Sequence, residues 1–383
     1  MKIPDLAPAL AALAADGLLR RRRTIEGPLG PRVRVDGRDL LCFGSNDYLG
    51  LAADARLVAA ACEGAHELGV GAGASHLVCG HNAAHEALEA RIAEFVGMPR
   101  ALVFSTGYMA NLGIVTALLD RHDAVFADRL NHACLNDAAL LSRATFQRYP
   151  HGDVGALERL LAASTAPRKL VASDAVFSMD GDLAPVPELI ALCERHGAWL
   201  LLDDAHGFGV LGRDGRGTPS HFDVRSPHLI HMGTLGKAAG VFGAFVAGDA
   251  ALIDLLLQRA RPYVYTTALP PLLARALLAS LDVIEREGWR RERLAALIAQ
   301  LKSALRPGRM RLLASDTPIQ PLLIGANDAA LLVGTALEDA GIWVPVIRPP
   351  TVPKGTARLR ISLSAAHTEA DVASLLDGLD RLR

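Results

Sequence analysis

Short apolar runs alternate with helical stretches from about residue 85 onward, and this alternation constrains the fold more than any other feature of the chain. Strands are predicted where Val, Leu, Phe and Ala run together, at residues 102–104, 124–127, 170–172, 198–202, 229–232 and 242–247. Helices are predicted between them, from Tyr108, from near Asn131 and from Val186. Because continuous apolar strands that alternate with helices are typical of a mainly parallel sheet covered on both faces, we predict an α/β fold.

The C-terminal part of the chain has a different pattern. It follows a long helical stretch predicted for residues 271–305, with a break near Gly288. A strand at 318–324 and a helix at 329–340 come next, and the polar–apolar alternation of 357–363 predicts a half-exposed strand. Thr368 and Asp371 have the spacing of a capping box that opens a last helix. These elements predict a smaller α+β domain.

Three parts are therefore predicted: an N-terminal helical arm at 1–45, a large α/β domain at 46–284 and a small C-terminal α+β domain at 285–383. The arm carries the basic run Arg20–Arg23 at the predicted end of an Ala- and Leu-rich helix. Such a run is usually a solvated helix terminus, stabilised by the helix dipole. A grip for an anion is the alternative.

Composition excludes several classes of protein. A hydrophobic content of 51% with 21% charged residues is typical of a globular protein with a large core. The net charge of −1 gives no reason to expect nucleic acid as a partner. No apolar run has the length of a membrane span, and the first residues lack the form of a signal peptide. The five cysteines are an odd number without a C-x-x-C pair, so we expect a cytoplasmic protein.

Lys237 ends the glycine-rich phrase Gly233–Lys237, directly after the apolar run at 229–232. It is one of five lysines in a chain with 40 lysines and arginines together. Arginine stays protonated, whereas a desolvated lysine can lose its proton and condense with an aldehyde. The alternatives are a lysine that binds a phosphate or carboxylate, and a surface charge. The residues around it must decide between these interpretations.

Polar residues follow the predicted strands, at the edge of an open parallel sheet where ligands bind. These segments are Ser105–Tyr108, Asp128–His132, Asp174–Asp182, Asp203–Gly207, and Thr234 with Lys237. The first of them opens a helix, whose free N–H groups and dipole suit a phosphate, although an ordinary helix cap would look the same. The sequence therefore brings a lysine, carboxylates, histidines and a possible phosphate site to one edge.

Pyridoxal phosphate would account for all of these segments. It requires a lysine for its aldehyde, a carboxylate beside its pyridine nitrogen, a cup for its phosphate and a flat group against its ring. Lys237, Asp203, Ser105–Tyr108 with Thr234, and His132 supply these in turn. His206 could bind the phenolic oxygen of the ring or the substrate.

Three other interpretations are weaker. Asp203, Asp204, His206 and His132 could bind a metal, but their spacing fits no metal motif and leaves Lys237 without a role. Gly71–His76 is similar to a dinucleotide fingerprint but lacks its last glycine. There is no G-x-S-x-G elbow of an α/β-hydrolase. We therefore predict no metal in the site.

The chain resembles the α-oxoamine synthases, within the fold type I group of pyridoxal-phosphate enzymes. The resemblance runs nearly from end to end and is carried by Ser45–Leu51, Asp128–His132, Val176–Asp182, Asp203–Gly212 and Gly233–Gly240. The tail Ile347–Pro353, followed by Ala357–Arg360, is most similar to the branch that joins L-alanine to a pimeloyl thioester in biotin synthesis. The resemblance implies a fold type I transferase with a large domain and a smaller C-terminal domain.

The resemblance also implies roles for single residues on the cofactor. Lys237 corresponds to the lysine that carries it, Asp203 to the partner of the pyridine nitrogen and His132 to the stacking residue. Ser178 and His206 flank the phenolic oxygen. The phosphate side is matched by Gly107, Tyr108 and Thr234. In the family the site is shared by two subunits of a homodimer, and Thr266 or Thr267 reaches the phosphate of the neighbouring subunit.

On the substrate side, Arg348 corresponds to the arginine that pairs with the amino-acid carboxylate, for which a planar guanidinium is suited. His132, Asn46, Thr351 and Arg20 (with Arg21 as the alternative) match substrate-contacting positions. The implied substrates are L-alanine and pimeloyl-CoA or a pimeloyl-carrier protein, condensed with loss of carbon dioxide. A relative that uses glycine with another acyl-CoA is the alternative. A noncatalytic subunit is disfavoured, because the lysine and its partner residues are intact.

Overall fold

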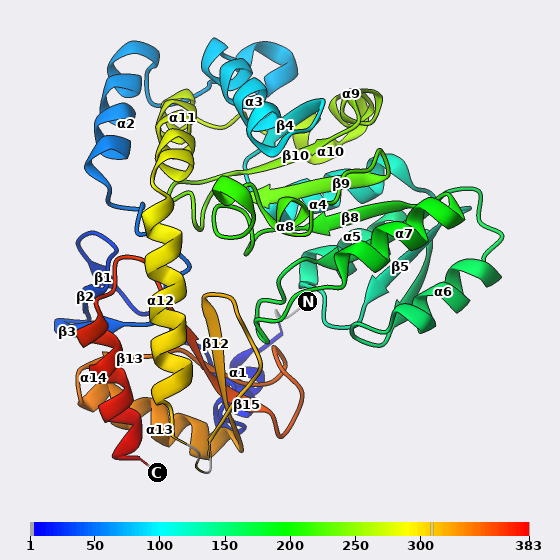
Figure 1. Ribbon diagram of the computed structural model, residues 1–383. Coiled ribbons are helices and arrows are strands. Elements are labelled where there is room, and N and C mark those ends of the chain that lie inside the picture. The colour runs from blue at the N-terminus through cyan, green and yellow to red at the C-terminus, as the bar shows by residue number, and fades with distance from the viewer. Residues whose placement is uncertain (1–3, 307, 309, 383) are drawn as a thin grey trace. The chain divides into compact units, whose positions relative to one another are not determined.

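The computed structural model describes residues 4–306, 308 and 310–382, and it divides into two compact units (Figure 1). Unit 1 comprises residues 1–46, 179–181 and 293–383, and unit 2 comprises residues 47–178 and 182–292. Residues 1–3, 307, 309 and 383 of the predicted domains lie outside the described residues. The division into an arm, a large and a small domain stays a prediction.

Unit 2 contains a seven-stranded sheet in the order β4-β10-β9-β8-β7-β5-β6. Its strands are β4 (Arg100–Phe104), β5 (Ala124–Asp128), β6 (Thr145–Tyr149), β7 (Lys169–Asp174), β8 (Trp199–Asp203), β9 (Leu229–Thr234) and β10 (Ala244–Gly248). Only β10 pairs antiparallel with its neighbours β4 and β9. The other pairs are parallel, so the predicted mainly parallel sheet is confirmed.

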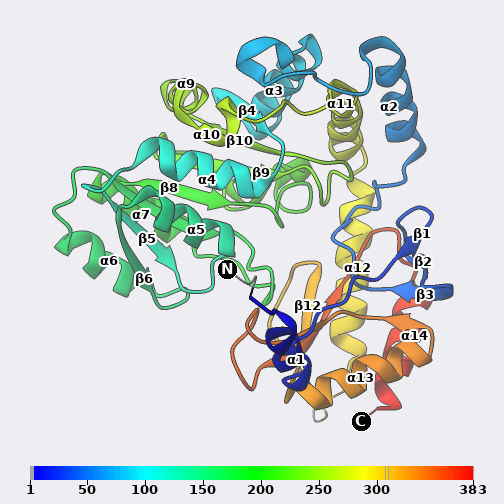
Figure 2. The same ribbon diagram turned by 180° about the vertical axis from the view of Figure 1, so that it is seen from behind.

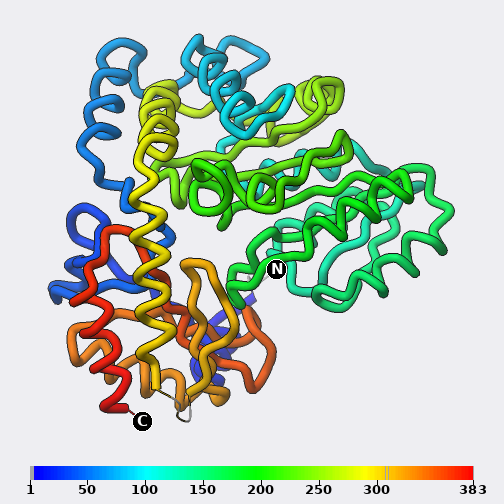
Figure 3. Tube along the Cα trace, viewed as in Figure 1, coloured from blue at the N-terminus to red at the C-terminus, as the bar shows by residue number. Residues whose placement is uncertain are grey.

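The helices of unit 2 are α2 (Ala55–Leu68), α3 (Ala83–Val96), α4 (Gly107–Leu118), α5 (Ala133–Ser142), α6 (Val154–Ala163), α7 (Val186–His196), α8 (Thr218–His221), α9 (Ala250–Arg259), α10 (Arg261–Val264) and α11 (Pro271–Arg286). A π-helical turn, His76–Gly80, precedes α3, and a 3-10 turn, Arg213–Gly215, precedes α8. The helical stretch predicted for residues 271–305 is interrupted at Glu287, between α11 and α12 (Gly288–Ala304), close to the predicted break at Gly288. Figure 3 shows the path of the backbone.

Apolar side chains of the strands alternate between the two faces of the sheet, which explains why helices cover both. Leu201 packs into a core cluster with α4 and α5, which lie in front of the sheet in Figure 2. Leu200 and Leu202 face the opposite way, into a cluster with α6 and α7 (Figure 1). Successive side chains of a strand point to opposite faces, so a strand that is buried on both faces is apolar at every position and its sequence is a continuous apolar run.

Unit 1 contains two four-stranded sheets, in the orders β1-β2-β3-β13 and β11-β12-β15-β14. The strands are β1 (Ile25–Glu26), β2 (Arg32–Val35), β3 (Arg38–Cys42), β11 (Arg311–Leu312), β12 (Ile319–Gly325), β13 (Ile342–Trp343), β14 (Val346–Ile347) and β15 (Ala357–Ser362). The helices are α1 (Ala7–Ala15), the part of α12 from residue 293, α13 (Asn327–Asp339) and α14 (Glu369–Asp380). The predicted capping box of Thr368 and Asp371 is confirmed at the start of α14.

One prediction about a single element was wrong, and two elements were missed. β15 is buried along its whole length rather than half-exposed, because Arg358 pairs with Asp180 at 2.7 Å and Arg360 hydrogen-bonds Asn46 at 3.0 Å. β6 and α6 were missed, since β6 is a sheet edge whose residues are mostly exposed or half-buried.

The basic run does not end a helix. The helix α1 ends at Ala15, and a left-handed Gly17 follows it, so Arg20–Arg23 lies in irregular chain. Arg23 forms ion pairs with Glu338, at 2.9 Å, and with Asp36. The interpretation of the run as a solvated helix terminus was therefore wrong. Among the described residues, no helix is long and apolar enough to cross a membrane.

Candidate active site

The carboxyl ends of the parallel strands of unit 2 enclose a cavity of about 220 Å³. Its walls are Gly107, Tyr108, His132, Cys134, Asp174, Val176, Ser178, Asp203, Ala205, His206, Met232, Thr234 and Lys237. Apart from Ser105, Thr106, Thr266 and Thr267, every residue predicted to bind the cofactor is in this set. Strand ends that are far apart in sequence therefore meet as the parallel topology predicts.

Asp203 ends β8 inside the protein, with only 6% of its surface exposed. One carboxylate oxygen accepts a hydrogen bond from the N–H of Ala205 at 3.0 Å, and the other accepts one from Nδ2 of Asn111 at 2.7 Å. Burial raises the pKa of Asp203, while the charge of Lys237, these two hydrogen bonds and His132 act in the opposite direction. The carboxylate is thus a buried acceptor whose charge depends on its partners.

Lys237 lies just after β9, and its Nζ is 2.9 Å from Nε2 of His206. The other ring nitrogen of His206, Nδ1, is 2.6 Å from the hydroxyl of Tyr48, which is completely buried. The amine, the imidazole and the phenol therefore form a continuous hydrogen-bonded chain. This chain fixes the position of the amine within the cavity.

His132 caps the start of α5 and presents its ring to the cavity. Its Nδ1 accepts the N–H of Cys134 at 3.3 Å and lies 2.9 Å from the thiol sulfur of the same residue. The backbone N–H of His132 donates to Oδ2 of Asp174 at 3.1 Å. Burial lowers the pKa of His132, so its ring is a neutral, flat surface suited to stacking.

Gly107 and Tyr108 begin α4, whose first turn is capped by the hydroxyl of Thr106 accepting the N–H of Met109 at 3.2 Å. The hydroxyl of Tyr108 hydrogen-bonds Asp137. Thr234 lies across the cavity and donates its hydroxyl to the carbonyl of Gly243 at 3.1 Å. A helix N-terminus next to hydroxyl groups is suited to an anion such as a phosphate.

Thr266 and Thr267 do not line this cavity. Thr267 pairs with Ser75 in an isolated β-bridge, and the N–H of Ala268 donates to the carbonyl of Ala74 at 2.9 Å. The two segments around these residues therefore lie side by side in unit 2.

Apart from His132, which lies in unit 2, the predicted substrate residues belong to unit 1. Three of them line a cavity of about 390 Å³, formed by Leu18, Leu19, Arg20, Arg21, Val346, Ile347, Arg348, Pro349 and Thr351. Nη2 of Arg20 donates to the hydroxyl of Thr351 at 3.4 Å, and Arg348 donates to the carbonyl of Gly17. Asn46 is not part of this wall and accepts a hydrogen bond from Arg360. The two alternatives, Arg20 and Arg21, both line the cavity.

Sequence reasoning gave no role to four residues at the site: Tyr48, Asn111, Cys134 and Asp174. Tyr48 lies in a motif that carried the resemblance, and Asp174 begins the polar segment that follows the predicted strand at 170–172. Asn111 was the most informative omission, since an amide in an apolar helix with no exposed surface needs a specific partner. A buried polar residue within a predicted helix could therefore have indicated it.

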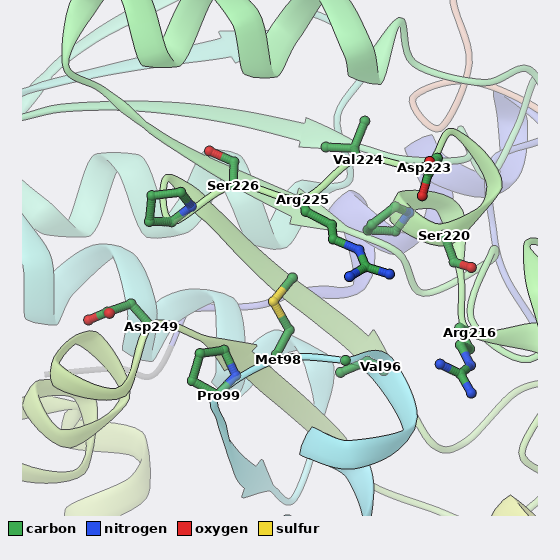
Figure 4. A pocket seen from close by; sticks show the side chains of 13 residues that line it. Val96, Met98, Pro99, Arg216, Ser220, Asp223, Val224, Arg225, Ser226 and Asp249 are labelled. Carbon is green, nitrogen blue, oxygen red and sulfur yellow. The ribbon is translucent and has the colours of Figure 1, made fainter.

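Two other features of unit 2 are not part of this site. Residues before β4 and β9, together with Asp249 after β10, enclose a cavity of about 590 Å³ at the amino ends of the strands (Figure 4). Among the described residues, the side chains close enough to share a metal ion are His76, His81 and His85, and His81 with Glu86 and Glu89. Neither group includes a wall residue of the smaller cavity.

A family model described as aminotransferase class I and II matches residues 38–379, so the chain belongs to that family. Within it, the chain is 60% identical over 383 residues to the 8-amino-7-oxononanoate synthase of Nitrosomonas eutropha, covering 99% of both chains. It is 63% identical over 358 residues to the protein of the same name in Nitrosospira multiformis, covering 94% of this chain and 90% of the relative.

Solved structures agree with these relatives. A serine palmitoyltransferase from S. paucimobilis with bound PLP–myriocin aldimine superposes with a TM-score of 0.92 at 30% identity, covering 98% of this chain and 96% of that one. An 8-amino-7-oxononanoate synthase from Francisella tularensis has a TM-score of 0.78 at 31% identity, covering 89% and 97%. The predicted resemblance and the predicted fold type I architecture are confirmed.

Proposed function

We propose that this protein catalyses the reaction of the 8-amino-7-oxononanoate synthases, condensing L-alanine with a pimeloyl thioester with loss of carbon dioxide, in biotin synthesis. One observation carries the proposal. The amine of Lys237, the buried carboxylate of Asp203 and the neutral ring of His132 line the same cavity. The relatives at about 60% identity, which share nearly the full length of the chain, support the choice of substrates.

The residues of the cavity fit pyridoxal phosphate. Asp203 offers a buried carboxylate oxygen, which is the partner that a protonated pyridine nitrogen requires. His132 offers a flat ring, and the start of α4 with Thr234 offers donors to a phosphate. When bound, the cofactor would supply an aldehyde that reacts with amines and a ring that accepts electrons from the Cα of an amino acid.

Each catalytic residue has a separate task. Lys237 would hold the cofactor and, once released from it, would take up and return the Cα proton of alanine, because an amine of this kind can alternate between its two protonation states. Asp203 would face the ring nitrogen as a carboxylate, with Asn111 and Ala205 donating to its two oxygens. His132 would lie against the ring and contact the substrate.

The remaining cofactor residues would hold the edge of the ring and the phosphate. Ser178 and His206 would bind the phenolic oxygen, and His206 is itself oriented by Tyr48. Gly107, Tyr108 and Thr234, which line the cavity at the start of α4 and after β9, would bind the phosphate.

The substrate residues would bind L-alanine and the pimeloyl thioester. Arg348 pairs with the carboxylate of alanine through its planar guanidinium, while Arg20, Asn46 and Thr351 contact the acyl substrate. The cavity that holds Arg20, Arg21 and Arg348 supports this assignment, since three guanidinium groups there suit anionic groups.

A homodimer with a shared active site would bring Thr266 or Thr267 to the phosphate of the neighbouring subunit. Exposed apolar side chains around the paired segments support this proposal. Val70 and Val78 are 78% and 77% exposed, and Tyr265, next to Thr266, is 70% exposed. Side chains of this kind usually mark a surface that another chain covers. The five cysteines are all free, which supports a reducing compartment such as the cytoplasm.

Incubation of the purified protein with pyridoxal phosphate, L-alanine and pimeloyl-CoA tests the function through release of the thiol and formation of the aminoketone. Glycine should be a poor but detectable substrate, since one methyl group is worth about 1–3 kcal/mol in discrimination. A parallel reaction with a pimeloyl-carrier protein identifies the preferred acyl carrier. Release confined to glycine with acetyl-CoA would instead show a glycine-specific member of the family.

A further inference from the structure

His151 lies between two segments that lead to the cofactor cavity. It follows β6, and it faces Asp128 at the end of β5 and Asp182 after the strand β7. We propose that His151 is a positioning residue that acts as a cation and ties these segments together, so that His132 and Ser178 are held against the cofactor. The proposal rests on the proposed function, which gives His132 and Ser178 their roles.

Both ring nitrogens of His151 are occupied by carboxylates. Nδ1 lies 3.1 Å and 3.2 Å from the two oxygens of Asp128, and Nε2 lies 2.7 Å from Oδ2 of Asp182. A carboxylate can only accept, so both nitrogens must donate, and an imidazole that donates from both is protonated. The ring of Phe177 meets the imidazole edge-on, with the ring centres 4.4 Å apart, and holds its plane.

The charge of this imidazole persists at neutral pH. Hydrogen bonds to Asp128 and then to Asp182 raise the pKa of His151 to about 10, against the opposing effect of burial. Within the part of the chain that the structure describes, Asp128 and Asp182 are the charged groups that contact the ring. Since the side chain of His151 is 30% exposed and that of Asp128 only 2%, much of the contact with Asp128 is shielded from solvent.

The contact with Asp128 reaches His132 through a short turn. The carboxylate of Asp128 accepts the N–H of Leu130 at 2.8 Å, and it also accepts the N–H of Gly152, next to His151, at 2.9 Å. It therefore joins the start of the turn at 128–132 to the segment of His151. His132 stands at the end of this turn, where it begins α5.

The contact with Asp182 reaches Ser178 through a second turn. The N–H of Phe177 donates to the carbonyl of Asp182 at 3.0 Å, and Val176 and Leu183 form a β-bridge. Ser178 follows Phe177 directly. Among the described residues, no hydrogen-bond partner reaches the buried Oδ1 of Asp182, so the contact of His151 with Oδ2 is the one that offsets the charge of this carboxylate.

A set of four proteins tests the proposal. His151→Gln keeps a donor but removes the charge of the imidazole. Asp182→Asn removes the charge of one partner, and the double variant combines the two changes. His228→Gln is the matched control, because the ring of His228 donates to the carbonyl of Ala198 and contacts neither turn. Each protein is measured without cofactor by amide hydrogen exchange, then for its Kd for pyridoxal phosphate and for kcat and KM.

We expect His151→Gln to speed exchange at residues 128–132 and 176–178 in the cofactor-free protein, with α9 unchanged. The Kd for pyridoxal phosphate should rise and kcat fall about tenfold or more, with little change in KM for the thioester, because a misplacement of about 1 Å can cost about 100-fold in rate. The double variant should resemble His151→Gln alone. Its changes in Kd and kcat should be smaller than the combined changes of the two single variants, since both substitutions break the same contact.

Two outcomes would overturn the proposal. If exchange rose equally in α9 and in the two turns, His151 would stabilise the whole unit rather than position two turns. If Kd and kcat stayed within twofold of those of the control, the turns would be held by other contacts. Exchange and Kd need no substrate, so a protein that fails to turn over alanine and pimeloyl-CoA would refute the proposed function and leave this test intact.

Discussion

The two cavities of unit 2 lie at opposite ends of the same strands and differ in kind. The cavity at the amino ends measures about 590 Å³, and the cavity at the carboxyl ends only about 220 Å³. In the larger one, Arg225 and Asp223 are exposed to solvent, and Figure 4 shows the side chains of Arg216, Arg225, Asp223 and Asp249 around its wall. Solvent there supports the charges of Arg225 and Asp223, whereas Arg216 lies 3.9 Å from both Asp214 and Glu285.

The smaller cavity contains polar groups that solvent does not support. Asp174, Asp203 and His206 are each buried, and each has a specific hydrogen-bond partner within the protein. Burial raises the pKa of Asp203 and, together with the charge of Asp203, raises that of Asp174 well above its ordinary value. Groups kept at such a cost to stability are typical of catalytic sites, so the chemistry of the wall identifies the site better than its volume.

Replacement of Lys237 should reduce activity more than any other substitution. A small loss would mean that the smaller cavity is not the active site. Lys237→Ala should abolish turnover, and Lys237→Arg should do the same, because a guanidinium keeps its charge but neither reacts with an aldehyde nor releases a proton. Borohydride reduction in the presence of pyridoxal phosphate, followed by mass spectrometry, should place the pyridoxyl group on Lys237. A pyridoxyl group found on another lysine would show that the site is elsewhere.

Asp203→Asn should have the second largest effect. The amide keeps the shape of the side chain but cannot stabilise a positive ring nitrogen, so cofactor should still bind while exchange of the Cα proton of alanine slows about 100- to 1,000-fold or more. Exchange in deuterated water, followed by NMR, measures this step apart from acyl transfer. Near-normal exchange would refute the role given to Asp203.

Asn111→Leu tests whether the charge of Asp203 depends on its neighbours. Loss of the 2.7 Å hydrogen bond removes one of the contacts that lower the pKa of Asp203, and a hydrogen bond to a charged group is worth about 1.5–3 kcal/mol. We therefore expect proton exchange to slow about tenfold or more at pH 7, with partial recovery at higher pH as the carboxyl ionises. A loss that did not depend on pH would indicate a packing defect instead.

The sheet could be predicted because strands buried on both faces have no freedom in composition. Leu200–Leu202 is apolar at every position, and the polar residues that follow such strands had to meet at one edge. Lys237, Asp203, His132, Ser178, His206, Gly107, Tyr108 and Thr234 all line the cavity there, whereas their roles remain predictions.

What the sequence could not show depends on contacts between distant residues. β15 looked half-exposed because Arg358 and Arg360 alternate with apolar residues, and only their distant partners Asp180 and Asn46 explain why both are buried. Asn111 and Tyr48 likewise acquire a role only through Asp203 and His206, which are far away in sequence. Local patterns predict secondary structure and the burial of apolar residues, but they show neither that a polar group is buried nor which group is its partner.

The pH dependence of the unfolding free energy tests whether Asp128 and Asp182, rather than solvent, stabilise the charge of His151. His151 has a pKa raised to about 10 from an ordinary value of 6.5, so its contribution to the unfolding free energy is complete below about pH 6.5 and is lost as pH rises through about 10. Urea unfolding of the wild type and of His151→Gln should therefore differ most near pH 6 and converge by about pH 10.5. A difference that stayed constant across this range would mean that the ring acts through packing and not through its charge.

Arg225→Gln should have the smallest effect and completes the comparison between the two cavities. The guanidinium lies in the wall of the larger cavity and is exposed, so its removal should change the unfolding free energy by no more than about 0.5 kcal/mol. Because the larger cavity lies at the opposite ends of the strands from Lys237, Kd for pyridoxal phosphate and kcat should both stay within twofold of the wild type. The same measurements on Asn111→Leu serve as the contrast, because Asn111 is uncharged and its loss should have a large effect. If Arg225→Gln reduced kcat as much as Asn111→Leu, the larger cavity would be coupled to the reaction. Buried polar groups with specific partners would then no longer distinguish the two cavities.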